Sequence, residues 1–116
     1  MSPKTINGKR TAPYRMWISS RQRARQHGWE HCLDVEDIVV PDVCPILGIK
    51  LIRNAGCQTP NSPSIHRVDS TKGYTVENII IISWRANDLI KNATFEECAQ
   101  IFKWWSAHID SHQSHQ

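Results

Sequence analysis

Residues 78–92 read NIIIISWRANDLIKN and carry the clearest structural signal in the chain. The four consecutive isoleucines are β-branched, and a short apolar run of this kind is typical of a buried strand. Residues 84–92 follow without a proline or a glycine and predict a helix. We therefore expect a strand that is opened by Asn78 and that passes directly into a helix.

The residues before this strand predict another strand and a long loop. Ile49–Ile52 is apolar and predicts the first strand. Residues 53–64 and 70–77 are rich in turn-forming residues, so the connection between the strands is predicted to be a loop with one short extended piece at Ile65–Val68. The order strand, loop, strand, helix then occupies about residues 44–92, which we expect to form the core.

Helices are predicted on both sides of this core. Residues 14–27 contain no proline or glycine, and Gly28 follows as a stop signal. Asp34 is a candidate N-cap for a short helical turn through Asp37. Thr94–Glu97 forms a capping box that begins an amphipathic C-terminal helix. With so few strands a barrel or a sandwich is excluded, and the predicted fold class is α+β.

The length of 116 residues suits a single domain. We expect residues 1–12 to form a flexible basic arm and residues 13–116 to form one folded domain. Trp104 and Trp105 are adjacent in the C-terminal helix, so one of them is expected to face the core. No apolar run approaches the ~20 residues needed to cross a bilayer, so we expect no membrane partner. No secretory signal is visible, and a cytoplasmic location is expected.

The positive charge is concentrated near the N-terminus. The formal net charge is +3, yet residues 1–28 contain seven cations and no acidic residue. Such a basic segment favours a polyanion partner, although a solvated helix face has the same composition. The cations expected to contact a nucleic-acid backbone are Lys9, Arg10, Arg15, Arg21, Arg23 and Arg25.

A histidine and two asparagines have a spacing that points to chemistry. His66 lies 12 residues before Asn78, and Asn87 lies nine residues after it. This pattern resembles the HNH nucleases of the ββα-metal class, in particular small phage and prophage HNH endonucleases of the recombination endonuclease VII-like or homing type. The motifs that carry the resemblance are Trp17, Arg23-Ala24, Gly28, Val35–Ile38, Cys44–Gly48, Ser62–Asp69, Gly73-Tyr74, Asn78, Ile82–Asn87 and Ala93–Glu97.

The resemblance implies a metal-dependent endonuclease that hydrolyses DNA phosphodiester bonds. It implies a ββα-metal core with flanking helices and one divalent cation, Mg²⁺ or Mn²⁺. Arg85, beside the expected metal site, is a further candidate phosphate contact, or it pairs with Asp88 or Asp37. The implied catalytic residues are His66, Arg67, Asn78 and Asn87, and the implied metal ligands are His66, Asp69 and Asn87.

Two departures from the family pattern affect these expectations. Arg67 stands where related proteins have a histidine base, and arginine stays protonated at neutral pH. Either His66 is itself the general base, or His66 is a metal ligand and no side chain acts as base; we favour the first. Many HNH proteins also carry two CxxC pairs that bind a structural zinc. Here Cys44 is the only cysteine of the four positions, so no structural zinc is expected.

Two other functions fit the same sequence. One is a non-catalytic DNA-binding module that keeps the fold, and the other is an HNH-like protein-interaction factor whose paired tryptophans form an interface. The oligomeric state is left open between a monomer and a homodimer.

Overall fold

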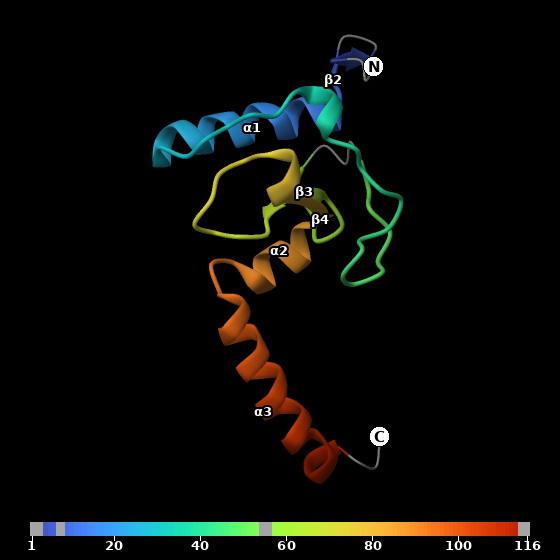
Figure 1. Cartoon of the computed structure of the whole chain (residues 1–116). Coiled ribbons are helices and arrows are strands. Elements are labelled where there is room, and N and C mark those ends of the chain that lie inside the picture. The colour runs from blue at the N-terminus through green and yellow to red at the C-terminus, as the bar shows by residue number, and fades with distance from the viewer. Residues whose placement is uncertain (1–3, 7–8, 54–56, 114–116) are drawn as a thin grey trace.

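The computed structural model describes residues 4–6, 9–53 and 57–113, and these residues form an α+β fold (Figure 1). Two antiparallel two-stranded sheets combine with helices on both sides of the larger sheet. In chain order the elements are β1 (Thr5–Ile6), β2 (Lys9–Arg10), α1 (Ala12–His27), the 3₁₀ turn Val35–Asp37, β3 (Pro63–Arg67), the 3₁₀ turn Val76–Asn78, β4 (Ile79–Ser83), α2 (Trp84–Ile90) and α3 (Phe95–Gln113).

The central element is the hairpin of β3 and β4. The two strands are antiparallel, with Ser64 opposite Ile82 and His66 opposite Ile80. Because side chains alternate along a strand, Ile65 points to the face opposite Ser64 and His66. The hairpin lies between α1 and α2 (Figure 1), and β4 passes into α2 without a linker.

Local capping signals define the ends of α1. Thr11 is the N-cap and accepts a hydrogen bond from the Tyr14 N–H at 3.4 Å. Gly28 ends the helix in the left-handed conformation with a φ of 72°, and its N–H bonds to the Ala24 carbonyl. The predicted stop at Gly28 is confirmed, and the helix begins at Ala12, two residues before the predicted start.

The buried side chains form two clusters, one on each side of Ile65. The larger cluster joins the hairpin to α2 and to the segment around residues 38–51, and it contains Ile38, Val40, Cys44, Leu51, Ile81, Ile82 and Ala86. The smaller cluster joins α1 to the loop before β4 and contains Ala24, Leu33 and Tyr74. Trp17 and Ile65 pack against both clusters, so α1 is fixed to the hairpin through them.

The cysteines of the described residues are free thiols. Cys44 is buried in the larger cluster, where its sulfur accepts hydrogen bonds from the N–H groups of Leu47 at 3.5 Å and Ser83 at 3.3 Å. Burial alone raises the pKa of the Cys44 thiol, but these hydrogen bonds, with further ones from the Ser83 hydroxyl and the Ile46 N–H, lower the pKa to about 7.

The predicted strand at Ile49–Ile52 is wrong. Only one isolated bridge forms there, between Val43 and Lys50, and the chain turns tightly at Gly48. Pro41 and Pro45 have no N–H to donate, so the pairing cannot extend into a ladder. The first strand of the hairpin is instead β3, which overlaps the short extended piece predicted at Ile65–Val68 within the loop, so His66 lies on a paired strand.

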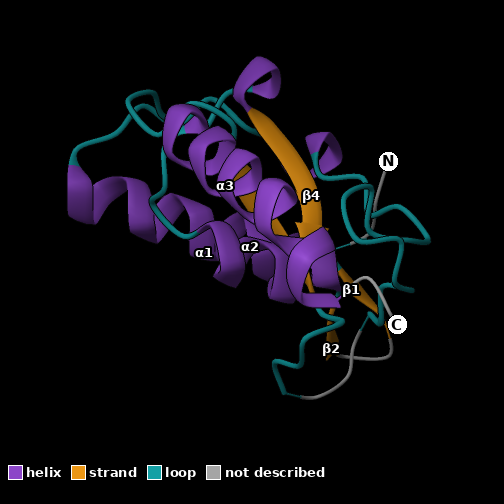
Figure 2. Ribbon diagram, turned by 90° about the horizontal axis from the view of Figure 1, so that it is seen from below, coloured by secondary structure: helices purple, strands orange, loops and turns teal. Residues whose placement is uncertain are grey.

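The predicted inward placement of Trp104 or Trp105 is also wrong. Both side chains are exposed, because α3 projects away from the hairpin (Figure 1) and packs extensively against no other described element. In Figure 2, which is seen from below, α3 lies in front of α1 and α2. The predicted capping box at the start of α3 is confirmed: the Thr94 N–H donates to Glu97 Oε1 at 2.8 Å, and the Glu97 N–H donates to Thr94 Oγ1 at 3.1 Å.

The loop between β3 and β4 lies directly against the segment after α1. The Tyr74 N–H donates to the Glu30 carbonyl at 2.8 Å, and the Cys32 N–H donates to the Tyr74 carbonyl at 2.9 Å. This contact requires glycine at position 73, because a Cβ there would lie 2.2 Å from the Glu30 oxygen. The backbone of Glu30 would have to move to make room.

We expect Gly73→Ala to lower the free energy of unfolding by about 3 kcal/mol, since overpacking against backbone cannot relax locally. Urea denaturation measures this loss. Gly48→Ala is the matched control: Gly48 has a φ of 73° and no atom within 4 Å of an added Cβ, so only the left-handed backbone costs about 1 kcal/mol. Equal losses in the two variants would contradict the close approach at Gly73.

Candidate active site

A pocket of about 560 Å³ lies where the end of β3, the end of α2 and the start of α3 meet. Its wall contains one histidine, one arginine of α1 and several polar groups of the loop after β3. The charged and polar residues of the wall include His66, Arg67, Asp69, Asn87, Lys91 and Arg23.

His66 and Asn87 meet at this pocket. His66 Nδ1 lies 3.1 Å from Asn87 Oδ1, and Asn87 Nδ2 donates to Ser64 Oγ at 2.7 Å. Ser64 and His66 share the α2-facing side of β3 because they are two residues apart. Asn87 lies one helical turn after Ser83, whose hydroxyl caps α2 by accepting the Ala86 N–H at 3.1 Å. Strand and helix therefore hold the two side chains together.

The hydrogen bond between His66 and Asn87 indicates which ring nitrogen carries a hydrogen. An amide oxygen only accepts, so the proton of the neutral ring lies on Nδ1 and the lone pair is on Nε2. Within the described residues, Nε2 has no hydrogen-bond partner. A neutral imidazole with a free Nε2 can accept a proton or bind a metal.

The donor pair also fits a divalent cation. Two ligands at right angles, each about 2.1 Å from a Mg²⁺-sized ion, lie about 3 Å apart. The separation of His66 Nδ1 and Asn87 Oδ1 is 3.1 Å, so both atoms can serve one cation once Nδ1 releases its proton. No group of three His, Cys, Asp or Glu side chains that could hold a metal occurs in the described part of the chain, so further ligands would come from solvent or substrate.

Asp69 lines the same pocket, but its carboxylate is directed at its own loop. Asp69 Oδ1 accepts hydrogen bonds from the Thr71 hydroxyl at 2.6 Å and the Thr71 N–H at 2.9 Å. The pKa of Asp69 is lowered, first by these hydrogen bonds and then by Lys72 and Arg67 nearby. The carboxylate thus stays ionised, and no contact joins it to His66 or Asn87 in the described structure.

Asn78 closes the loop that follows β3. Its Oδ1 accepts the Asp69 N–H at 2.9 Å, and its Nδ2 donates to the carbonyls of Asp69 at 3.1 Å and Gly73 at 2.8 Å. Asn78 is 7% exposed, and its bond to Gly73 is buried, whereas its two bonds to Asp69 are partly buried. The residue lies in the 3₁₀ turn just before β4, and it holds the loop without reaching the pocket itself.

The Arg67 side chain is held by contacts with the loop after β3 and with Trp29. Its Nη1 donates to the carbonyls of Ser70 and Lys72, each at 2.8 Å. The guanidinium also lies 3.5 Å from the centre of the Trp29 ring, which is a close cation–π contact. Arg67 therefore stabilises the loop against the segment after α1, and only part of its guanidinium remains available to a ligand.

The predicted DNA-contacting cations separate into groups. Arg10, Arg15 and Arg23 line a cleft of about 830 Å³ between α1 and residues 57–65, and Arg23 also lines the His66 pocket. Arg21 lies over the Trp17 ring at 4.5 Å. Arg25 is exposed in the last turn of α1 and Arg85 is exposed on α2, and neither residue lines either cavity. The side chain of Lys9 lies outside the described part of the structure.

Three residues that contribute to the candidate site were not predicted from the sequence. Ser64 positions Asn87, and the alternation of Ser64 with His66 on one strand would have revealed it. Trp29 supports Arg67, a contact between distant segments that no local pattern encodes. Lys91 lines the pocket with a positive φ of 49°, and the prediction that the helix continued to residue 92 concealed it.

No family model, curated protein or solved structure matches the chain. The likeness to HNH nucleases thus rests on the motifs quoted above. Across the described residues, no helix is both long enough and apolar enough to span a bilayer.

We expect Asn78→Ala to lower the free energy of unfolding by about 3 kcal/mol, because it leaves buried backbone groups of Asp69 and Gly73 unpaired. Asn87→Ala is the control, since its partners are side chains that can turn to water, and we expect a loss of about 1 kcal/mol. Urea denaturation of both variants measures the difference. A loss for Asn78→Ala no larger than that for Asn87→Ala would show that Asn78 does not hold the loop.

Proposed function

We propose that the protein is a metal-dependent HNH-type endonuclease that hydrolyses DNA phosphodiester bonds. The observation that carries this proposal is the contact between His66 on β3 and Asn87 on α2, at a pocket that an arginine of the basic helix also lines. The succession β3, β4, α2 supports it, because the HNH resemblance implies a histidine on the first strand, an asparagine opening the second and a final ligand on the helix.

His66 is the general base in the proposed reaction. Among the described residues that line the pocket it is the only histidine, and Asn87 Oδ1 accepts its Nδ1 proton, which orients the ring and leaves Nε2 to take a proton from the attacking water. Arg67 cannot take that role, since it is cationic and bonded to loop carbonyls.

A divalent cation held by Asn87 would neutralise charge on the scissile phosphate and on the leaving oxygen. Asp69 lines the same pocket but bonds to Thr71, so its carboxylate would have to turn from its loop to serve as a further ligand. In the alternative assignment His66 is a ligand of that cation, and no side chain acts as base. The 3.1 Å separation of His66 Nδ1 and Asn87 Oδ1 is compatible with both assignments.

The basic cleft supports DNA as the substrate. Arg10 of β2 and Arg15 and Arg23 of α1 line this cleft, and Arg23 also lines the catalytic pocket. A duplex backbone that follows this cleft would pass His66. Such contacts neutralise phosphates, so they position the DNA and carry little sequence information.

We expect the protein to relax supercoiled plasmid with Mg²⁺ or Mn²⁺ and to be inactive in EDTA. His66→Ala should lower the cleavage rate at least about 100-fold, because a general base is lost. Asn87→Ala should lower it about 10-fold or more, because ring orientation and metal contact are lost. His108→Ala, an exposed histidine on α3, is the control and should cut at the unaltered rate.

Calorimetric titration with Mn²⁺ separates the two roles of His66. If His66 is the base, His66→Ala keeps the metal affinity of the unaltered protein and loses only rate. If His66 is a ligand, the affinity falls. Unaltered protein that binds DNA but cuts none with either metal contradicts the proposed activity.

We expect the affinity for DNA to fall steeply with salt, because phosphate contacts release counterions. Arg23→Ala should weaken binding and lower the slope of log K against log salt by about 0.9 for the contact removed. Fluorescence anisotropy with duplexes of unrelated sequence measures both quantities. Lys103→Ala, on α3, is the control and should leave the slope unchanged; a slope that Arg23→Ala does not alter contradicts the placement of DNA in the cleft.

A non-catalytic DNA-binding module is the second candidate. The observation that favours it is Arg67, which stands in the usual base position and is bonded into the loop. This candidate predicts the same salt dependence without cleavage, so the plasmid assay distinguishes the two.

A further inference from the structure

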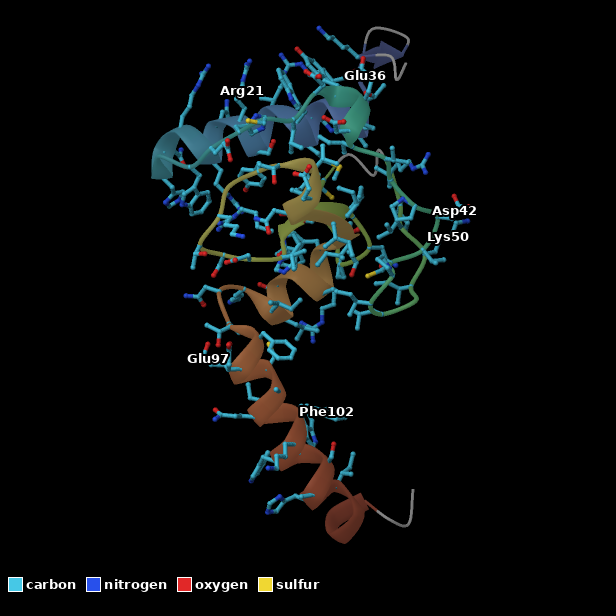
Figure 3. The ribbon with its side chains drawn as sticks, in the orientation of Figure 1. Arg21, Glu36, Asp42, Lys50, Glu97 and Phe102 are labelled. Atoms are coloured by element: carbon cyan, nitrogen blue, oxygen red, sulfur yellow. The ribbon has the colours of Figure 1, made fainter. Side chains whose placement is uncertain are left out.

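The apolar side of α3 is uncovered. Glu97 and Phe102 project on different sides of the helix, well away from the hairpin (Figure 3). The large apolar side chains of α3 remain exposed at Phe95 (83%), Phe102 (74%), Trp104 (61%), Trp105 (57%), Ile101 (54%) and Ile109 (39%).

These side chains follow the spacing of a helix–helix seam. Phe95, Cys98, Phe102, Trp105 and Ile109 are separated alternately by three and four residues, which is the repeat that places one residue per turn along a contact line. Ile101 and Trp104 widen the seam at its middle. A soluble monomer rarely leaves so continuous an apolar surface in water.

The charge of α3 indicates a protein partner. Between Phe95 and Ile109 the helix carries Glu96 and Glu97 and only one cation, Lys103. This composition suits neither a nucleic-acid backbone nor an anionic lipid surface, since both require clustered cations.

The geometry points to a second copy of this chain, and we propose that two α3 helices pair antiparallel about a two-fold axis at Phe102. In that pairing Phe95 lies opposite Ile109 of the second copy, and the small Cys98 lies next to the large Trp105, one residue away from exact register. Glu96 at the acidic first turn lies opposite His108 near the other end. The seam is thus complementary to itself in size, as an isologous dimer requires.

The exposed area is sufficient for such a dimer. A fully exposed aromatic side chain presents ~200 Å² of surface. With the exposed fractions given above, the four aromatic side chains of α3 together present roughly 550 Å² to solvent. Ile101 and Ile109 add to this area. The total approaches the ~800 Å² that each partner of a standard interface buries.

Sedimentation velocity of the full chain over a wide range of concentration tests the proposal. We expect a dimer, about twice the 13.4 kDa of one chain. Phe102→Glu should weaken the dimer at least about 100-fold, because it puts two carboxylates together at the axis. Gln100→Glu adds the same charge to the same helix away from the seam and should leave the Kd unchanged. Circular dichroism of each variant checks that the helices are retained.

A paired substitution tests the antiparallel arrangement. Phe95→Lys and Ile109→Glu should each dissociate the dimer, whereas the double variant should restore it, since the introduced lysine of each copy would meet the introduced glutamate of the other. A monomeric unaltered protein, or a dimer that Phe102→Glu leaves intact, overturns the proposal. Dissociation without rescue in the double variant overturns the antiparallel pairing. None of these outcomes depends on nuclease activity.

Discussion

The side-chain amide of Asn78 is the constraint on which the candidate site depends. From the end of the loop between β3 and β4, it bonds to Asp69 near the start of the loop and to Gly73 at its middle. The closed loop presents the carbonyl groups that bind Arg67, and Arg67 in turn stacks on Trp29. One buried amide therefore links the end of the strand that carries the proposed base to the segment that follows the basic helix.

Signals that act over one or two turns were readable from the sequence. Gly28 ends α1 as predicted, and Thr94 and Glu97 cap α3 reciprocally as predicted. The isoleucine run forms β4, and it passes into the helix that holds Asn87. These elements are encoded by neighbouring residues, so a local pattern is enough to find them.

Contacts between distant segments were not readable in the same way. Ile49–Ile52 has the better apolar pattern for a strand, yet Pro63–Arg67 forms it, because only the latter has a full ladder with β4. The stacking of Arg67 on Trp29 joins residues far apart in the chain, whereas the resemblance implied only a catalytic role for Arg67. The spacing of His66 and Asn87 identified them as candidate site residues, but their hydrogen bond depends on the register of β3 against β4, which the sequence did not predict.

The separation of α3 from the body of the molecule has an evolutionary consequence. Beyond its first turn the helix contributes little to either buried cluster, so substitutions along it leave the hairpin and its pocket undisturbed. Selection can therefore alter what this helix associates with while the pocket of the body is conserved. A lineage could exchange or lose the helix beyond its first turn, which lines the pocket, and still inherit the proposed hydrolytic centre.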